Sequence, residues 1–128
     1  MELAFLLGRI LFGGYFVLMS SNHFLKAGML KGYAQSKGVP APGVAVFVSG
    51  LLIFLGGLGV LLGVFIPLSI LFLVIFLFFI SLKMHNFWTI QDPMQKMAEK
   101  VNFLKNFALL GASLMFLAIP EPWVYGLF

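Results

Sequence analysis

The chain has 128 residues, of which 62% are hydrophobic, only 9% are charged and none is cysteine. In soluble domains about a quarter of the residues are charged. This composition therefore excludes a soluble globular fold and indicates that lipid surrounds most of the chain. The net charge of +4 comes mainly from lysines at the ends of apolar runs, which is typical of membrane orientation and not of nucleic-acid binding, and the lack of cysteine excludes disulfides and thiolate metal sites.

Four apolar segments are long enough to cross a bilayer as helices, and they cover about residues 3–23, 44–63, 67–88 and 102–119. None of them alternates apolar and polar residues as the strands of a membrane barrel do. The predicted fold class is therefore all-α: an integral membrane four-helix up-down bundle that forms a single transmembrane domain over residues 1–128.

The first segment contains a charge, Arg9, about two turns from its start. A charged group at that depth is costly and usually faces the interior of a bundle. We interpret Arg9 as a structural charge, with Glu2 and Glu121 as the available carboxylate partners. The alternative is that its side chain snorkels to lipid phosphates.

The first two connections differ in character. Residues 26–42 place the pairs "ML" and "YA" at helical spacing between lysines, which predicts an amphipathic segment lying at the membrane interface. The second connection is short, and Gly63 and Pro67 suit a helix end and a helix start. The sequence therefore predicts a tight hairpin between the second and third spans.

The third connection contains a second amphipathic interfacial segment. Asp92 is a good N-cap, Pro93 is a good first helical residue, and Gln95 can complete a capping box. We expect a helix to begin there and to continue into the fourth span.

Lysine residues set the expected orientation. They lie in the first and third connections, whereas the hairpin has none. By the positive-inside rule the two long connections are cytoplasmic and both termini lie outside. Trp123 and Tyr125 are then expected in the outer aromatic belt.

Small residues are expected to let the helices approach closely, because apolar burial does not drive helix association in lipid. The inward-facing candidates are Gly8, Gly13 and Gly14 in the first span, the run "GGLGVLLG" in the second, and Ala108, Gly111, Ala112 and Ser113 in the fourth. The spacing Gly59-x-x-x-Gly63 suits an internal contact and a homodimer equally.

Polar residues gather at the cytoplasmic ends of three spans. The first span ends at "NHF", the third ends at "HNFW", and the fourth begins near "KNF". Alternating topology brings these ends to one surface, where the candidate binding residues are Asn22, His23, His85, Asn86, Trp88, Lys105 and Asn106. The alternative is that these side chains cap helix ends and snorkel to the headgroups.

Three kinds of binding remain open for this surface. The polar side chains could bind the ring oxygens of a quinone beside an apolar slot. His23 and His85 could ligate a haem, but they are the only histidine pair and both lie near the surface. The lysines could instead dock a soluble partner or anionic lipid.

Catalytic chemistry is not visible in the sequence. The chain has only four acidic residues and no His-x-x-x-His pattern, so no metal site and no catalytic residue is identified. Whether the protein is an enzyme is left open.

Five stretches resemble one family, in matching order from Gly8 to about Leu117. They are "GRILFGGYFVLMSSNHF", "GYAQSKGVPAP", "SGLLIFLGGLGVLLG", "HNFW" and "FLKNFALLGASL", and they are similar to the DoxX family of small four-helix membrane proteins. The resemblance implies a multi-pass protein of a bacterial or archaeal plasma membrane. It also implies a link to quinone chemistry, because the family takes its name from a subunit linked to a terminal quinol oxidase and to thiosulfate:quinone oxidoreduction.

The family motifs fall on particular residues of this chain. They are Arg9, Asn22, His23, Gly56, Gly57, His85, Trp88, Lys105 and Asn106. Two positions depart from the family pattern, because many members carry an acidic residue at the position of Ile53 and glycine at that of Ser20. If that acid handles protons or pairs with the arginine, this chain lacks the function, which favours an accessory role.

The sequence thus predicts an integral membrane subunit associated with quinone-linked redox chemistry, which binds a quinone or docks a redox partner at its cytoplasmic end. The alternative is a non-catalytic assembly or scaffold subunit of a membrane protein complex. A solute carrier fits less well, because no proline breaks the first two spans. The expected partners are the lipid bilayer and another membrane or peripheral protein subunit, and no nucleic acid.

Overall fold

The computed structural model describes residues 1–126. Within this range the chain contains five α-helices, one short 3-10 helix and no strand. They are α1 (Glu2–Leu25), α2 (Ala27–Ser36), α3 (Pro42–Leu62), α4 (Ile66–Met84), η1 (Phe87–Thr89) and α5 (Pro93–Phe116). The all-α prediction is confirmed, and the predicted number of helices is corrected, because the first connection forms a helix of its own, α2.

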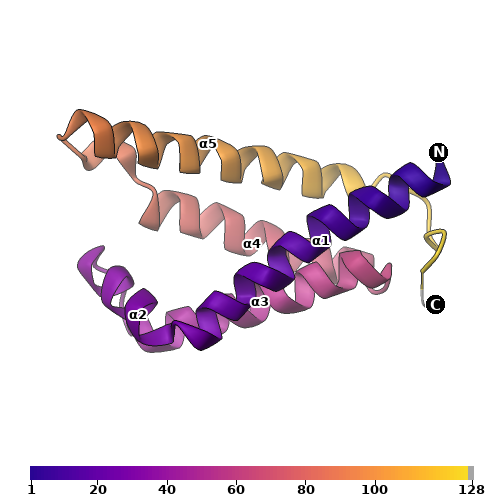
Figure 1. Ribbon diagram of the computed structural model, residues 1–128, viewed down its shortest axis with the longest axis horizontal. Helices are drawn as coiled ribbons and strands as arrows, with labels where there is room; N and C mark the ends of the chain where they lie inside the picture. The colour runs from indigo at the N-terminus through magenta and orange to yellow at the C-terminus, as the bar shows by residue number, and fades with distance from the viewer. Residues whose placement is uncertain (127–128) are drawn as a thin grey trace.

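Four long helices lie along one axis of the molecule (Figure 1). α1, α3, α4 and α5 run in alternating directions, and α2 lies at the end where α1 leads into α3. We call this the polar end. The start of α1, the turn between α3 and α4, and the segment after α5 lie at the opposite end, which we call the distal end.

Three stretches are long and apolar enough to cross a membrane: α1, α3, and Ile66–Thr89, which begins with α4. α5 falls outside this set because Glu99, Lys100 and Lys105 interrupt its apolar residues. The predicted third-connection helix and the predicted fourth span are one continuous helix, Pro93–Phe116. Residue 102 is therefore not a helix boundary.

Local sequence accounts for two of the helix ends. Asp92 caps α5, because its Oδ2 accepts a hydrogen bond of 3.0 Å from the Gln95 N–H, as the sequence predicts. α3 ends at Gly63, whose φ of 72° is a left-handed conformation that costs glycine little. α4 begins three residues later, at Ile66, with Pro67 in its first turn, so the predicted tight hairpin is present.

The helices pack as a chain of neighbours, α1 against α3, α3 against α4, and α4 against α5. Their shared core consists of eight buried side chains: Phe16, Ile53, Val60, Ile66, Ile70, Leu73, Leu77 and Trp123. Many other large apolar side chains of the long helices point outward, which is the arrangement expected where lipid is the solvent.

Only some of the predicted small residues lie at helix contacts. A Cβ atom added at Gly59 would lie 1.8 Å from the Ser69 Oγ atom of α4. The same addition at Gly8, Gly14 or Gly111 would meet no atom within 4 Å, so the expectation that these three glycines face inward is wrong. Atoms of the same chain already lie against Gly59 and Gly63, so a homodimer would have to form through another surface.

Arg9 is enclosed at the distal end with only 1% of its surface exposed. Its guanidinium donates to backbone carbonyls of α3, with Nε 3.2 Å from the Val60 oxygen and Nη2 3.1 Å from the Leu61 oxygen. It also donates to the carbonyls of Val124 and Tyr125 in the segment after α5. The expected carboxylate partners are therefore replaced by backbone oxygens, and the side chain does not snorkel.

Of the two residues predicted to form an aromatic belt at this end, only Tyr125 is exposed. Trp123 is 3% exposed and packs edge-on against Phe5 and Phe116. The Arg9 guanidinium lies 5.6 Å from the Trp123 ring centroid, within the range of a cation–π contact. Trp123 is thus part of the Arg9 enclosure and not an interfacial anchor.

Candidate functional site

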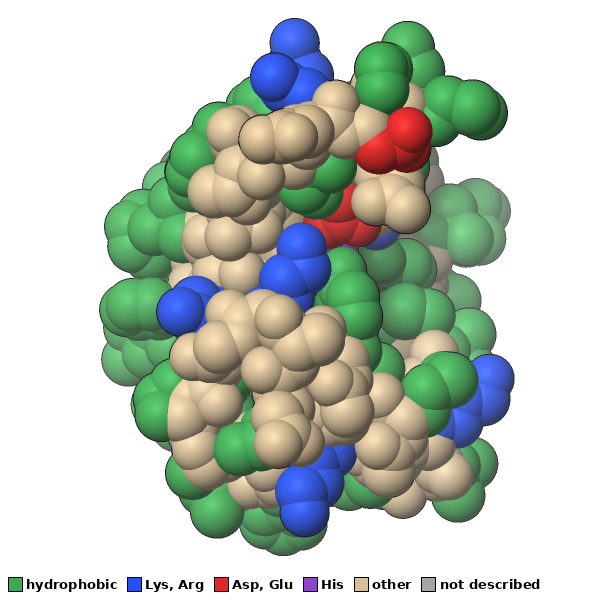
Figure 2. Space-filling view, turned by 90° about the vertical axis from the view of Figure 1, so that its left-hand side faces the viewer, with side chains coloured by type: hydrophobic (Ala, Val, Ile, Leu, Met, Phe, Trp, Pro, Cys, Tyr) green, Lys and Arg blue, Asp and Glu red, His purple; other side chains and the backbone are tan. Residues whose placement is uncertain are grey.

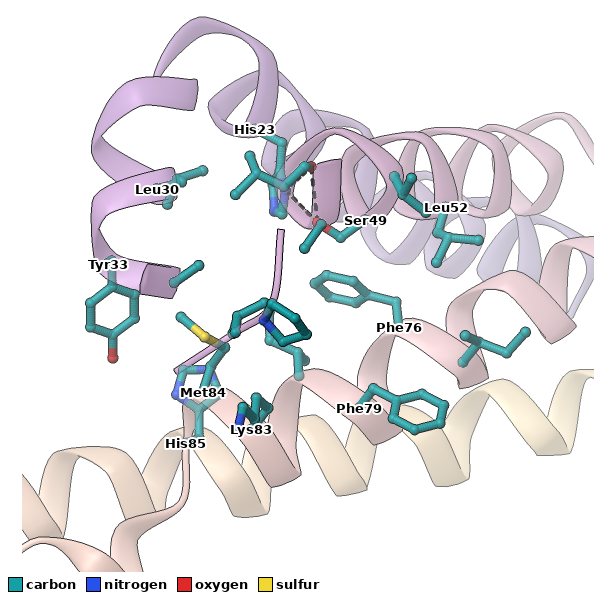
Figure 3. Close-up of a pocket in the computed structure, with 18 residues that line it drawn as sticks. His23, Leu30, Tyr33, Ser49, Leu52, Phe76, Phe79, Lys83, Met84 and His85 are labelled. Atoms are coloured by element: carbon teal, nitrogen blue, oxygen red, sulfur yellow. Dashed lines mark hydrogen bonds between the residues drawn. The ribbon is translucent and has the colours of Figure 1, made fainter. Parts of the chain in front are cut away.

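An apolar cavity of about 520 Å³ lies at the polar end between α1, α2, α3 and α4. Figure 3 shows His23 extending into it from one side, with Met84 and His85 on the opposite wall. The remaining lining is almost entirely apolar, and Leu52 and Phe76 form its deep part. This volume lies in the range of pockets that hold small organic molecules.

His23 is fixed by two partners on α3. Its Nδ1 lies 3.2 Å from the Val46 carbonyl oxygen and 3.0 Å from the Ser49 Oγ atom. Ser49 in turn donates its hydroxyl hydrogen to the Val46 oxygen at 3.0 Å. The ring also meets the Phe76 ring edge-on, with 5.9 Å between centroids. These contacts hold the imidazole in one orientation between α3 and α4.

His85 is fixed from the other side, by α5. It ends α4 as the C-cap residue, and its Nδ1 lies 2.8 Å from Glu99 Oε2. Both side chains are largely shielded, with 17% and 16% of their surfaces exposed. Asp92 caps α5, and Glu2 and Glu121 belong to the distal end, so Glu99 is the one acid placed beside the cavity wall.

Tyr33 of α2 and Lys83 of α4 also line the cavity (Figure 3), and both residues are exposed. Burial raises the pKa of the Tyr33 phenol above its ordinary value, and the nearby negative charge of Glu99 raises that pKa further. Lys83 is exposed and lies at the last turn of α4. Polar side chains therefore lie on several walls of an otherwise apolar cavity.

The cavity also borders the surface that would face lipid. Val48 of α3 and Phe79 of α4 line it, and they are 45% and 63% exposed. An apolar chain could lie between these two helices while a polar group reaches the histidines. The site thus has a polar head region and an apolar lateral side.

The face of the molecule at the polar end is mixed in character. Figure 2 shows lysine side chains scattered across it, acidic groups on one side, and hydrophobic side chains around its rim. Charged residues on the end of the bundle and apolar residues on the sides of its helices are the pattern of an end that leaves the membrane while the helix sides stay in lipid.

The structure brings only two of the predicted site residues into the cavity, His23 and His85. Asn86 does not line it, and its Oδ1 accepts from Lys37 Nζ at 3.4 Å. Asn22 is partly exposed, and its carbonyl accepts from the Lys26 N–H at the end of α1. These two asparagines therefore make hydrogen bonds at the ends of α1 and α4, outside the cavity.

The other predicted residues lie away from the cavity. Trp88 is 52% exposed and packs edge-on against Phe87 and Phe103. Lys105 reaches from α5 toward α1, with its Nζ 3.4 Å from the Tyr15 hydroxyl. Asn106 is buried on α5. The sequence signals that selected the two histidines lining the cavity did not separate them from these other residues.

Sequence reasoning missed Ser49 and Glu99, which hold the two histidines. Ser49 stands out as the only hydroxyl residue within "PGVAVFVSGLLIFLGGLGVLL", the sequence of α3. Glu99 is one of only four acids in the chain. Both were visible as rare residues, but which histidine each one meets depends on how the helices pack.

Metal binding is not indicated by this arrangement. Among residues 1–126, no group of three or more His, Asp or Glu side chains lies close enough together to hold an ion. Ile53, where many members of the family resembled carry an acid, is fully buried beside Phe16 in the core. No carboxylate is therefore available at that position to act in the site.

A family model described as DoxX matches residues 4–86 of the chain. The matched region includes α1 to α4 and ends just after His85, so it contains both histidines of the cavity. No curated protein and no solved structure matches the chain.

Proposed function

The chain belongs to the DoxX family, and we propose from that premise that it is a membrane subunit that binds a quinone in the cavity at its polar end. The observation that carries the proposal is that His23 and His85, which come from different helices, line one apolar cavity. A quinone needs polar partners for its ring oxygens and an apolar passage for its tail. The histidines supply the first, and the surface between Val48 and Phe79 supplies the second.

The residues present suit this ligand better than a haem. Each imidazole is held by a different helix at the edge of the cavity, His23 by α3 and His85 by Glu99 of α5. A bis-histidine haem needs two imidazoles facing each other across the flat iron complex. A quinone ring has its two oxygens on opposite sides, so its two imidazole partners do not need to face each other.

The proposed orientation follows the lysines. With the polar end in the cytoplasm, both termini lie outside, and α5 makes the fourth crossing with its C-terminal part. The proposed location is a bacterial or archaeal plasma membrane, where membrane quinones are held. In this orientation the ligand's head lies at the cytoplasmic side of the bilayer and its tail lies between lipid chains.

The first test is a reduced-minus-oxidised absorption spectrum of the protein purified in mild detergent. A quinone that remains bound gives a difference spectrum of its own, which extraction and chromatography can then identify. A haem spectrum in its place would contradict the quinone proposal. A flat spectrum is followed by titration with a short-chain benzoquinone, and absence of saturable binding there would also contradict it.

Single-residue variants locate the ligand. His23→Ala and His85→Ala should each weaken binding of the quinone or of its reduced quinol form, by roughly 10-fold for the loss of one buried hydrogen bond. Lys31→Ala is the matched control, since Lys31 lies at the same end but does not line the cavity. If both histidine variants retain the affinity of the unaltered protein while folded, the ligand is bound elsewhere.

Docking of a partner protein is the second candidate function, and the lysines on the polar end face favour it (Figure 2). In this case the protein is a scaffold subunit whose cavity is incidental. Capture of partners from solubilised membranes should then weaken with salt and with Lys37→Ala or Lys96→Ala, and should be unchanged in His23→Ala.

A further inference from the structure

The two cavity histidines share a feature beyond their position. Each uses Nδ1 to contact a group of the protein, and neither uses Nε2 in any hydrogen bond among the described residues. A neutral imidazole carries its proton on one ring nitrogen only, and the partner of one nitrogen decides which it is. The contacts of Nδ1 therefore decide what Nε2 can offer to a ligand.

The partners of His23 require a proton on its Nδ1. The Val46 carbonyl oxygen can only accept a hydrogen bond, so the 3.2 Å contact needs a hydrogen from the ring. Ser49 could in principle donate to Nδ1, but its hydroxyl hydrogen is directed to the same Val46 oxygen. Its Oγ therefore accepts from Nδ1 at 3.0 Å. The neutral ring presents Nε2 as an acceptor.

The partner of His85 has the same effect by a different route. An ionised carboxylate only accepts hydrogen bonds, so the 2.8 Å contact between Nδ1 and Glu99 Oε2 needs a ring proton on Nδ1. The neutral His85 ring thus also presents Nε2 as an acceptor. The two histidines line one cavity from different walls, and in their neutral forms neither ring carries an N–H at Nε2.

We infer that the cavity prefers the reduced, dihydroxy form of its ligand, a quinol, over the oxidised quinone. The inference rests on the proposed function and deepens it. A quinol carries two hydroxyl donors that match the two Nε2 acceptors, whereas a quinone carries two carbonyl acceptors that do not. In an apolar chamber an acceptor that faces another acceptor is left without a partner, and this penalty discriminates strongly between the two forms.

The other polar groups of the cavity set the strength of this preference. Lys83 is a donor and would favour a carbonyl, but it is exposed at the last turn of α4. The Tyr33 hydroxyl of α2 can serve either form, and Lys37 is directed to Asn86. The histidines are therefore the groups that discriminate. Ser49 and Glu99 act through them as positioning residues.

The test without ligand is nitrogen NMR of the full chain in lipid nanodiscs with labelled histidine. The chain has only two histidines, so His23→Gln and His85→Gln assign both sets of signals. The expected result is that the proton lies on Nδ1 in both rings. A proton on Nε2 in either ring, or a doubly protonated His85 beside Glu99, would overturn the inference.

The test with ligand compares duroquinol, kept reduced under anaerobic conditions, with duroquinone in the same nanodiscs. Two hydrogen bonds of ordinary strength predict that the quinol binds roughly 30-fold more tightly. Glu99→Gln should reduce this ratio to about 5-fold or less, because an amide N–H can donate to Nδ1, and the ring proton of His85 can then lie on Nε2. Lys31→Ala should leave the ratio unchanged.

The outcomes separate the two proposals. If duroquinone binds at least as tightly as duroquinol and His23→Gln weakens both, the quinone site stands and the preference for the quinol is wrong. If neither compound shows saturable binding, the proposed function is wrong and this inference falls with it. If the quinol binds more tightly but Glu99→Gln does not change the ratio, the assignment of the preference to the tautomer of His85 is overturned.

Discussion

Gly13 and Gly57 each occupy the space that a side chain on the other would need. A Cβ atom added at Gly13 would lie 2.7 Å from the Gly57 carbonyl oxygen, and one added at Gly57 would lie 2.9 Å from the Gly13 oxygen. The backbones of α1 and α3 are therefore in direct contact at this point. In lipid, such contact is a main source of attraction between helices.

Gly57→Ala is expected to destabilise the protein by about 1–3 kcal/mol, because the added methyl group meets backbone atoms that cannot move independently. Gly14→Ala is the matched control, since nothing lies within 4 Å of its added Cβ. The control should be neutral or more stable by up to about 1 kcal/mol. Thermal unfolding followed by circular dichroism in detergent measures both. Equal midpoints would contradict the close contact.

Arg9→Met should lower stability by roughly 3 kcal/mol, because backbone carbonyls of α3 and of the segment after α5 lose their donor. Amide hydrogen exchange should increase first in residues 123–126. Lys26→Met, an exposed lysine at the polar end, serves as the control. Unchanged exchange after Arg9→Met would show that the segment is held by the aromatic contacts of Trp123 alone.

Ser49→Ala should cost about 1 kcal/mol of stability and loosen His23, because the Nδ1 atom loses one of its two acceptors. Ser21→Ala removes a serine whose hydroxyl also bonds to a backbone oxygen of α1, but on an exposed surface. That control should change stability by less than about 0.5 kcal/mol. The measurement is again the thermal midpoint, and equal effects of the two variants would contradict a special role for Ser49.

Asp92→Ala should destabilise the start of α5 by about 1 kcal/mol, because the Gln95 N–H loses its acceptor. Asp92→Ser keeps an N-cap oxygen and should restore most of the stability. Hydrogen exchange of the Gln95 amide reports the cap directly. Full protection of that amide in the alanine variant would contradict the assignment.

The raised pKa of Tyr33 leads us to expect that the folded protein loses stability at alkaline pH. The Tyr33 pKa in the folded protein is raised above the ordinary value of 10.0, so folding favours the neutral phenol. This contribution is fully present below pH 10 and is lost as the pH rises through the raised pKa. The difference in thermal midpoint between the unaltered protein and Tyr33→Phe should therefore shrink at alkaline pH.

A second variant tests the cause of that shift. Glu99→Gln removes the negative charge but leaves most of the burial, so the Tyr33 pKa should fall part of the way toward its ordinary value. Absorbance titration of tyrosinate, with Tyr33→Phe subtracted, measures the shift. An unchanged Tyr33 pKa in Glu99→Gln would assign the whole shift to burial.

The helices were predictable because their signals are local. Apolar length identifies α1, α3 and α4, Asp92 identifies the start of α5, and Gly63 identifies the end of α3. Each depends on residues within a few positions of one another. The expected continuation of α5 into the fourth span is confirmed, because helix propensity continues smoothly from the polar part of α5 into its apolar part.

The contacts between helices were less predictable, because adjacent residues can face opposite ways. Gly13 meets α3, whereas Gly14 meets nothing, although they are neighbours in one helix. Likewise His85 lines the cavity and Asn86 does not. Neighbouring residues point about 100° apart around a helix, so only one of two similar candidates can face a given partner. Which one does so depends on how the whole helix is rotated about its axis, and packing between helices sets that rotation.

The partners of Arg9 were mistaken for a general reason. Sequence reasoning pairs a buried charge with an opposite charge, and Glu2 and Glu121 were the only acids expected at that end. The structure uses carbonyl oxygens, which every residue carries and which therefore leave no mark in the sequence. Helix ends and turns are where such oxygens are free.

The carbonyls that surround Arg9 come from widely separated parts of the chain, and this imposes an order on biogenesis. Arg9 enters the membrane with the first helix, whereas Val124 and Tyr125 are synthesised more than a hundred residues later. Until then the guanidinium must stay hydrated, reach the headgroups or be shielded by the insertion machinery, because the hydrocarbon core of the bilayer offers it no acceptor. Completion of the bundle is thus coupled to delivery of its last segment, and a nascent chain truncated before residue 124 should remain a substrate for quality-control proteolysis.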